Sequence, residues 1–377
     1  MLSFAIFKQT ADARAASADG VATMGQHFPQ EAQSRRLRHY GANQRKMLAF
    51  LCNARQNTSD EATAIRDWKT KQLPNEPSKK SGSTDMQRSV HLNSFELFAR
   101  DINDVDVELL HALTIAVRWP HRQKDWEFLR RVGQGIAAVD GIGRVFGSAM
   151  WFPHGDDFAT IGLVITTPRT QALGGGRWLM NQVLERCGKR NLALNSTHAA
   201  YPLYLSLGFT SEAVVHMHQG EVRPSPPPLP GLDGELQKIS RDRIAELTSL
   251  DAYAFGVNRA GLLAALAETS SIAVLSRGGE IVGYSMSREY GRGLQVGPVV
   301  ARNDCDAAHL TAAHLRDLTG RFVRVDTRER GGLFAEFLEA SGLAFFETVT
   351  TMSKGRRLPG RETDMPWIYG LASHAVG

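Results

Sequence analysis

The part of the sequence best suited to hold a ligand is the run VITTPRTQALGGGR, residues 164–177. Its apolar start predicts the end of a strand, and its three glycines come directly before a predicted helix. The first N–H groups of a helix have no partner inside the helix, and the helix dipole adds positive potential there. Glycines let a phosphate group approach such a backbone closely. The pattern therefore suits a pyrophosphate, although tight strand-to-helix connections without a ligand also show it.

Spacing excludes several other ligand-binding patterns. The sequence has no G-x-x-x-x-G-K-S/T run, so it contains no P-loop. Residues 141–147 read GIGRVFG, in which the last glycine stands one position too far along for the nucleotide-binding pattern G-x-G-x-x-G. This stretch instead predicts a hairpin turn. His216 and His218 would share one face of a strand, but no third metal ligand accompanies them. We therefore expect no metal site.

The elements around the glycine-rich run alternate between strands and helices. Their predicted order is a strand at 95–99, helices at 105–116 and 125–132, strands at 135–139, 143–151 and 159–166, a helix at 177–187, a strand at 191–195, a helix at 201–207 and a strand at 209–218. A proline-rich run at 224–230 cannot lie inside a helix or a central strand and predicts a domain boundary. Residues 236–351 then repeat the order of elements, which indicates a duplication.

Length and composition indicate a soluble protein of two or three domains, since the chain has 377 residues with 42% hydrophobic and 22% charged residues. No run approaches the roughly 18 consecutive apolar residues of a membrane span. The three cysteines stand far apart, which argues against a disulfide framework and for the cytoplasm. The sequence leaves the oligomeric state open.

Charge is distributed unevenly along the chain. Residues 1–92 hold 14 Lys and Arg against 8 Asp and Glu, whereas residues 93–377 hold 30 against 31. We expect a basic, mostly disordered leader at 1–92, a first domain at 93–222, a proline-rich linker at 223–233 and a second domain at 234–377. Because the folded part is near neutral, the sequence argues against a nucleic-acid partner.

Two blocks of the sequence resemble the GNAT superfamily of N-acetyltransferases. The family motif Q/R-x-x-G-x-G/A appears as QALGGG at residues 171–176, and about 30 residues further on HAAYPLYLSLGF at 198–209 matches the pattern L-Y-x-x-L-G-F. The resemblance covers about residues 95–218 by motifs and 236–352 by architecture only. It implies an α/β (α+β) fold, a GNAT-like mixed, mostly antiparallel sheet flanked by helices, in tandem with a degenerate second domain.

The resemblance also implies acetyl-CoA as the donor. Backbone groups at the end of the strand would pair with the pantetheine arm where the sheet splays open, and N–H groups of the glycine loop would hold the pyrophosphate. The donor site would comprise Val164, Ile165, Thr166, Gln171, Ala172, Leu173, Gly174, Gly175, Gly176 and Arg177. Tyr204 would lie near the thioester sulfur, where a phenol with a pKa of about 10 can protonate the leaving thiolate. Alternatively, Tyr204 packs in an apolar cluster.

The base that deprotonates the amine is not evident from the resemblance. Many family members carry a Glu on the strand before the second block, but residues 191–195 hold no carboxylate, and Thr197 replaces a common Asn. Deprotonation would then use water or one of His121, His154, Asp156 and Asp157.

Trp119, His121 and Arg122 lie in the segment that borders the acceptor pocket of GNAT domains. Together they could bind an acidic or planar substrate. They could equally belong to a proline-ended helix with Trp119 packed inside and the charged groups in solvent.

The second half lacks both motifs, since residues 302–306 read RNDCD and residues 337–342 carry no tyrosine. We expect that this half does not bind CoA productively, supports the first half and contributes Arg288 and Asp326 to the acceptor pocket. The whole chain is expected to be an N-acetyltransferase that moves an acetyl group from acetyl-CoA to an amine of a small molecule or peptide by direct attack. The alternative is a non-catalytic acyl-CoA-binding sensor or regulatory module, which the missing base and the degenerate half favour.

Overall fold

The computed structural model describes residues 89–92, 95–168, 171, 173–224 and 227–377. The predicted leader therefore lies outside the described residues up to Arg88, as does Ala172 of the predicted donor site. The strands and helices expected for 95–218 and 236–351 are present, with ends that differ by a few residues. None of the helices in the described ranges is both long enough and apolar enough to cross a membrane.

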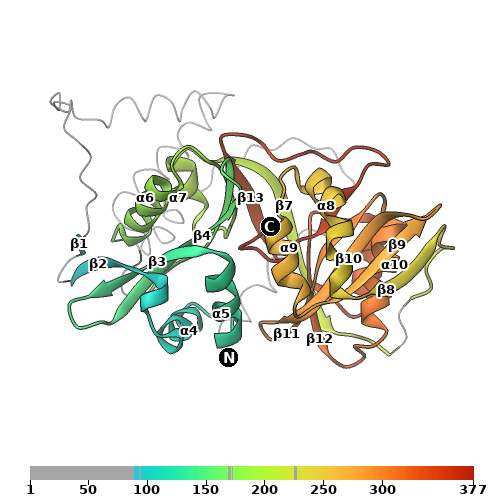
Figure 1. The fold of residues 1–377 in the computed structure, drawn as a ribbon. Coiled ribbons are helices and arrows are strands. Elements are labelled where there is room, and N and C mark those ends of the chain that lie inside the picture. Colours follow the sequence, from blue (N-terminus) through green and yellow to red (C-terminus); the bar gives the residue numbers. More distant parts are fainter. Residues whose placement is uncertain (1–88, 93–94, 169–170, 172, 225–226) are drawn as a thin grey trace, which may run out of the picture. The chain divides into compact units, whose positions relative to one another are not determined.

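The described strands form one mixed sheet, in which all neighbours are antiparallel except two parallel pairs, β5–β6 and β11–β12 (Figure 1). The strands are β1 (Ser89–Leu92), β2 (Phe95–Asp101), β3 (Gln134–Asp140), β4 (Val145–His154), β5 (Phe158–Thr166), β6 (Asn191–Ser196), β7 (Thr210–Glu221), β8 (Glu235–Ile239), β9 (Ser271–Arg277), β10 (Glu280–Tyr290), β11 (Gly293–Ala301), β12 (Phe322–Thr327), β13 (Ala344–Lys354) and β14 (Trp367–Gly370).

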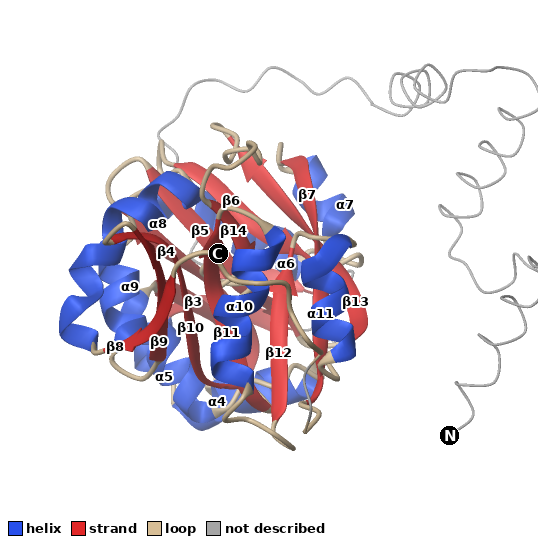
Figure 2. Cartoon of the chain, turned by 90° about the vertical axis from the view of Figure 1, so that its right-hand side faces the viewer, coloured by secondary structure: helices blue, strands red, loops and turns tan. Residues whose placement is uncertain are grey.

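Helices lie in the connections between these strands. They are η2 (Ile102–Asp104), α4 (Val107–Ala116), α5 (Gln123–Val132), α6 (Gly175–Cys187), α7 (Tyr201–Ser206), η3 (Arg241–Leu247), α8 (Thr248–Phe255), α9 (Ala260–Ala267), α10 (Asp304–Leu315) and α11 (Gly332–Ala340). Helix α10 lies beside α11 in the second half (Figure 2), and both contribute to the apolar core that contains β11 and β12.

Both faces of β3 are covered, which explains why the middle of this strand is apolar. Successive side chains of a strand point to opposite faces. Ile136 and Ala138 of β3 belong to the apolar cluster that contains α6, whereas Ala137 and Val139 belong to the cluster that contains α4 and α5. The strand therefore has no face available for polar residues.

The two halves of the chain exchange strands. Strand β13 of the second half lies between β6 and β7 of the first half, with Thr351 opposite Asn195 and Val349 opposite Val215. Strand β7 in turn pairs with β12, so that Met217 lies opposite Asp326. Figure 1 shows β13 beside β7. One continuous sheet therefore joins residues from both halves at its centre.

Candidate active site

Strands β5 and β6 diverge partway along their length. They pair in parallel from Phe158–Asn191 to Ile161–Leu194, and β5 then continues alone to Thr166. We call this point of divergence the apex. Val164, Ile165 and Thr166 lie beyond the apex, and β4 pairs with this stretch from the other side through Ile165 and Thr166. Among the described residues, no strand pairs with the β6-facing edge of β5 at Val164–Thr166, where the pantetheine arm was expected.

The glycine loop leads into helix α6, which begins at Gly175, two residues earlier than the sequence predicted. Gly174 is the N-cap residue with φ of 94°, a left-handed conformation that favours glycine. The N–H groups of Gly175, Gly176 and Arg177 stand in the first turn, where an α-helix offers them no acceptor. A Cβ atom at Gly174 would meet no other atom within 4 Å, so the loop is open on this side. These features fit a pyrophosphate.

Side chains around the loop hold it to its neighbours. Gln171 Nε2 donates to the carbonyl oxygen of Thr166 at 3.3 Å, and Arg177 Nη2 donates to Ser206 Oγ of α7 at 2.7 Å. Leu203 of α7 would lie 3.4 Å from a Cβ atom at Gly176. The loop, the start of α6 and α7 are thus in mutual contact, whereas Leu173 is half-buried between them.

Tyr204 lies on α7 and is 5% exposed. Its ring packs against Phe209 with centroids 6.0 Å apart, and its hydroxyl forms no hydrogen bond with any described residue. Burial raises the pKa of this phenol above its usual value, which keeps the hydroxyl protonated. Tyr204 is therefore protonated at neutral pH but is a weaker acid than a free phenol, and it occupies the apolar cluster named as its alternative place.

A cavity of about 200 Å³ adjoins the apex. Its lining from the first half includes Arg118, Trp119, His121, Gly162, Leu163, Asn195 and Thr197. Its lining from the second half includes Tyr290, Arg292, Arg324, Phe346, Glu347, His374 and Ala375. The cavity is thus built by both halves, and its volume suits a small molecule.

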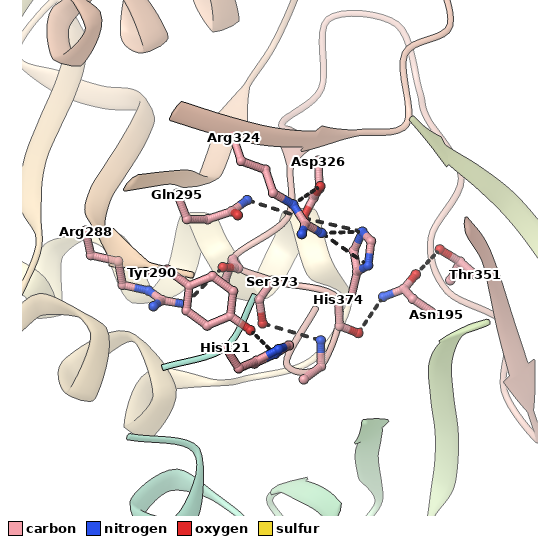
Figure 3. Close-up of polar contacts among 12 residues, drawn as sticks. His121, Asn195, Arg288, Tyr290, Gln295, Arg324, Asp326, Thr351, Ser373 and His374 are labelled. Atoms are coloured by element: carbon pink, nitrogen blue, oxygen red, sulfur yellow. Dashed lines mark hydrogen bonds and ion pairs between the residues drawn. The ribbon is translucent and has the colours of Figure 1, made fainter. Parts of the chain in front are cut away.

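His121 and Tyr290 form a hydrogen-bonded pair in the cavity wall (Figure 3). His121 Nε2 and Tyr290 Oη are 2.7 Å apart, and Nδ1 of His121 is buried without a hydrogen-bond partner among the described residues. Burial lowers the pKa of His121 to about 4 and raises the pKa of Tyr290 to about 12. At neutral pH the imidazole is therefore uncharged and can accept a proton.

A second polar cluster contains Arg324, Asp326 and His374. Arg324 donates to both carboxylate oxygens of Asp326, at 2.7 and 2.8 Å, and His374 Nε2 lies 3.4 Å from Asp326 Oδ2. Burial disfavours the charged carboxylate, but Arg324 and His374 together hold the pKa of Asp326 below its usual range. Asp326 therefore stays charged and holds Arg324 in the cavity wall, where Arg324 is a lining residue.

The last described residues of the chain close the cavity at the apex. Asn195 Nδ2 donates to the carbonyl oxygen of His374 at 2.9 Å, while Thr351 Oγ1 donates to Asn195 Oδ1 at 2.7 Å. A Cβ atom at Gly162 would lie 2.6 Å from the Cβ of Ala375, so only glycine permits this contact. Asn195 lies on the strand where many family members carry a Glu that acts as the base. In this protein its amide instead joins β6 to the second half.

The predicted acceptor residues are only partly brought together. Trp119 and His121 line the cavity, with ring centroids 5.9 Å apart. Arg122 instead pairs with Asp125 at 2.9 Å and with Glu289 of β10 at 3.0 Å. It joins the start of α5 to the second half and is not among the cavity-lining residues.

Of the four side chains considered as bases, His121 alone is among the cavity-lining residues. His154 is buried against Phe158 and Phe255, and Asp156 and Asp157 are exposed. Of the two second-half residues named from the sequence, Asp326 holds Arg324 as described, and Arg288 lies over the ring of Tyr290 with its guanidinium carbon 4.5 Å from the centroid.

The second half contains the same divergence of strands, but its own chain occupies the gap. Strands β11 and β12 pair only at Leu294–Val323 and Gln295–Arg324. Beyond this point β14 pairs with β11, and Leu371 N donates to the carbonyl oxygen of Asp326 on β12 at 2.8 Å. This groove is therefore filled by a strand that the sequence did not predict.

Acidic side chains also cover the start of α10, where the first half has its glycine loop. Asn303 caps the helix by accepting from Asp306 N at 2.9 Å. Asp306 pairs with Arg277 at 2.6 Å, and Asp304 pairs with Arg361 at 2.9 Å. Carboxylates therefore stand at the start of this helix, where the first half has its glycine loop; the expectation that this half does not bind CoA productively stays a prediction.

Most second-half residues of the cavity wall were not found from the sequence. Tyr290, Arg292, Arg324, Glu347 and His374 belong to no motif, and strand exchange brings them to the first half. Arg118 directly precedes the predicted Trp119, so extending that segment by one residue would have included it.

Within the described residues, no group of three or more His, Cys, Asp or Glu could hold a metal ion.

Comparison with known proteins agrees with this architecture. The model of the acetyltransferase (GNAT) family matches residues 107–209, and that of an acetyltransferase (GNAT) domain matches residues 247–369. The uncharacterized N-acetyltransferase YitH of Bacillus subtilis (strain 168) is 30% identical over 196 residues, which are 51% of this chain and 68% of that protein.

Solved structures show the same fold at low sequence identity. The crystal structure of a Pyrococcus horikoshii protein assigned as an acetyltransferase aligns with a TM-score of 0.62 at 17% identity, covering 78% of this chain and all of that one. The glucosamine N-acetyltransferase region of a fungal multi-domain β-N-acetylglucosaminidase aligns with a TM-score of 0.52 at 15% identity. The alignment covers 70% of this chain and 38% of that one. The chain belongs to the GNAT family of N-acetyltransferases and carries two GNAT domains in tandem.

Proposed function

We propose that this protein transfers an acetyl group from acetyl-CoA to the amine of a small molecule or peptide in the cavity at the apex. One observation carries the proposal. Gly162, Leu163 and Asn195 stand where β5 and β6 diverge, and the same residues line the cavity. The expected donor groove and the cavity therefore meet at one point, as transfer between two substrates requires.

Donor binding would use the open edge of β5 and the start of α6. Backbone groups of residues 164–166 would hold the pantetheine arm, and the N–H groups of residues 174–177 would hold the pyrophosphate. Residues 302–306 offer no such site in the second half. Donor binding is therefore assigned to the first half alone.

The chemistry would be a direct attack. The amine nitrogen forms a bond to the acetyl carbonyl carbon, the carbon–sulfur bond breaks, and the electron pair leaves with sulfur. Tyr204, whose hydroxyl is protonated at neutral pH, would supply a proton to this thiolate, and burial makes it a weaker acid for this step than a free phenol. The products are an amide and free CoA.

The proton lost by the amine would go to His121. Its imidazole is uncharged at neutral pH, and its buried Nδ1 has no other partner among the described residues. A nitrogen that has bonded to a carbonyl carbon is far more acidic than a free ammonium group, so a base with a low pKa suffices. Tyr290 would hold the ring in position through Nε2.

The second candidate is an acyl-CoA-binding sensor without catalysis. It is favoured by the position of Tyr204 outside the cavity lining and by the absence of a carboxylate in β6. A sensor would bind acetyl-CoA through the same groove but would release no thiol in the presence of any amine.

Release of free CoA thiol from acetyl-CoA, measured with and without a panel of amines, separates the two. We expect amine-dependent thiol release, and we expect it to fall at least tenfold in His121→Gln, as for a lost base. Arg241→Gln is a suitable control, because this exposed residue lies in η3 outside the cavity lining. Stabilisation by acetyl-CoA without thiol release from any amine would support the sensor.

A further inference from the structure

The cavity wall carries more positive charge than its own acids balance. Arg118, Arg292 and Arg324 line the cavity, and Glu347 is the acidic side chain in its lining. Arg324 is already matched by Asp326. Arg118 and Arg292 form no ion pair with any described residue. The guanidinium groups of Arg118 and Arg292 are therefore available to bind a ligand in the cavity.

The unpaired state of Arg292 does not result from a lack of acids nearby. Glu289 precedes it by three residues, but this carboxylate contacts Arg122 at 3.0 Å and Arg321 at 3.5 Å. Asp125 is likewise engaged by Arg122 and by the N–H of Gly291, at 2.9 Å each. These two acids are thus engaged by other groups, and Arg292 has no counterion among the described residues.

One contact brings Arg118 and Arg292 to the same part of the wall. Pro120 packs against Gly291, where a Cβ atom would lie 3.4 Å from Pro120 Cγ. Arg118 stands two residues before this proline, and Arg292 directly follows this glycine. The segment after α4 and the turn between β10 and β11 therefore each contribute one arginine to the cavity lining near this contact.

Local structure restricts the side chain of Arg292 and the backbone of Arg118, and both residues are exposed at the cavity. The guanidinium carbon of Arg292 lies 4.6 Å from the ring centroid of Phe322, which restricts the side chain. Arg118 has φ of 61°, a left-handed conformation that is uncommon outside glycine. Leu163 of the same cavity has φ of 50°. Such backbone conformations persist where the surrounding structure enforces them, often at ligand sites.

We propose that the amine accepted by this enzyme carries an anionic group, a carboxylate or a phosphate, which Arg118 and Arg292 bind. Guanidinium groups match both anions through paired N–H donors. With about 200 Å³ available, the acceptor is a small molecule of amino-acid size. The inference rests on the proposed acetyl transfer, because it identifies the class of the acceptor for that reaction.

Matched pairs of amines test this inference. One arm compares amino acids with their carboxamides, and a second arm compares O-phosphoethanolamine with ethanolamine. We expect the anionic member of at least one arm to have a kcat/KM at least ten times that of its neutral partner, mainly through a lower KM. The arm with the larger ratio identifies the anion as carboxylate or phosphate.

Variants then assign the effect to the two arginines. Arg292→Gln and Arg118→Gln should each reduce the ratio of anionic to neutral kcat/KM by about tenfold to a hundredfold, as for one charge-assisted hydrogen bond. In both variants the kcat/KM for the anionic amine should fall more than the kcat/KM for the neutral amine. Arg241→Gln, on an exposed helix outside the cavity lining, should leave the ratio unchanged.

Binding measured without turnover separates this inference from the transferase assignment. The anionic amines should raise the melting temperature of the protein without acetyl-CoA, and Arg292→Gln should abolish the shift. If they bind in this way but no amine releases thiol, the anion site stands and the transferase assignment fails. If neutral amines are acetylated as well as their anionic partners, or the ratio survives both substitutions, the inference is overturned.

Discussion

The hydroxyl of Tyr290 lies 2.7 Å from Nε2 of His121, although 169 positions separate the two residues in the chain. His121 follows the first helix of one GNAT domain, and Tyr290 ends a strand of the other. Nδ1 of the same imidazole has no hydrogen-bond partner among the described residues. Two domains thus position one side chain at the cavity where we place acetyl transfer.

Removing the Tyr290 hydroxyl should loosen the imidazole without removing it. We expect Tyr290→Phe to lower kcat by about tenfold, less than the 10²–10⁴-fold typical of a lost acid–base group, because only the positioning of His121 suffers. The affinity for acetyl-CoA should stay the same. Steady-state kinetics with any accepted amine measure this, and Tyr253→Phe, on the half-exposed Tyr253 of α8, is the matched control. A kcat equal to wild type would remove Tyr290 from the site.

A charged side chain at Gly174 should prevent donor binding. Gly174→Glu places a carboxylate where the loop faces open space, so it would repel a pyrophosphate. Acetyl-CoA at 100 times its Kd stabilises a binding protein by about 2.7 kcal/mol, and this gain should vanish in the variant. Gly174→Asn is the control, since Asn tolerates the left-handed backbone without adding charge. Melting curves with and without acetyl-CoA decide the matter, and undiminished stabilisation in Gly174→Glu would place the donor elsewhere.

Tyr204→Phe should slow turnover while leaving the donor bound. If the phenol protonates the leaving thiolate, kcat should fall by roughly 10²–10⁴-fold, and acetyl-CoA affinity should change little. The loss should shrink at high pH, where the thiolate departs more easily without a proton. Tyr201→Phe, one turn earlier on α7, is the control. Profiles of kcat against pH that coincide for wild type and Tyr204→Phe would show that Tyr204 only packs in its apolar cluster.

The chain should bind one acetyl-CoA. Strand β14 fills the gap between β11 and β12, and Asp304 and Asp306 stand at the start of α10. Isothermal titration calorimetry should therefore give one site per chain in the wild type and none in Gly174→Glu. A site that remains in that variant would show that acetyl-CoA binds without the glycine loop.

Acid should destabilise the protein partly through His154. Burial lowers its pKa to about 4, with a smaller contribution from Arg259. Between pH 6.5 and 4 the unfolded state therefore binds more protons than the folded state, and the free energy of unfolding falls as the pH drops. The loss from this one group reaches about 3 kcal/mol at pH 4.

His154→Phe should remove that part of the pH dependence. The ring already packs against Phe158 and Phe255, and its Nε2 has no hydrogen-bond partner among the described residues. Urea unfolding at several pH values should show a flatter curve than wild type, whereas replacing the exposed His198 by Gln should not change the slope. An unchanged slope in His154→Phe would mean that this imidazole does not govern acid stability.

The order of strands and helices and the glycine loop followed from the sequence, because each depends on residues close together in the chain. Apolar periodicity decides whether a segment is a strand or a helix. Three glycines before a helix decide where backbone N–H groups are exposed. The resemblance to GNAT proteins rested on two such local blocks, at 171–176 and 198–209.

Only the tertiary structure decided which strands from different halves would pair. A strand edge offers the same N–H and C=O groups to any partner, so no local pattern predicts that β13 enters between β6 and β7 or that β14 fills the second groove. That pairing brings Arg324 and His374 to the cavity wall that also contains His121. Arg122 instead forms ion pairs with Asp125 of the first half and Glu289 of the second. Local sequence therefore determined the donor loop, and long-range strand pairing determined the cavity.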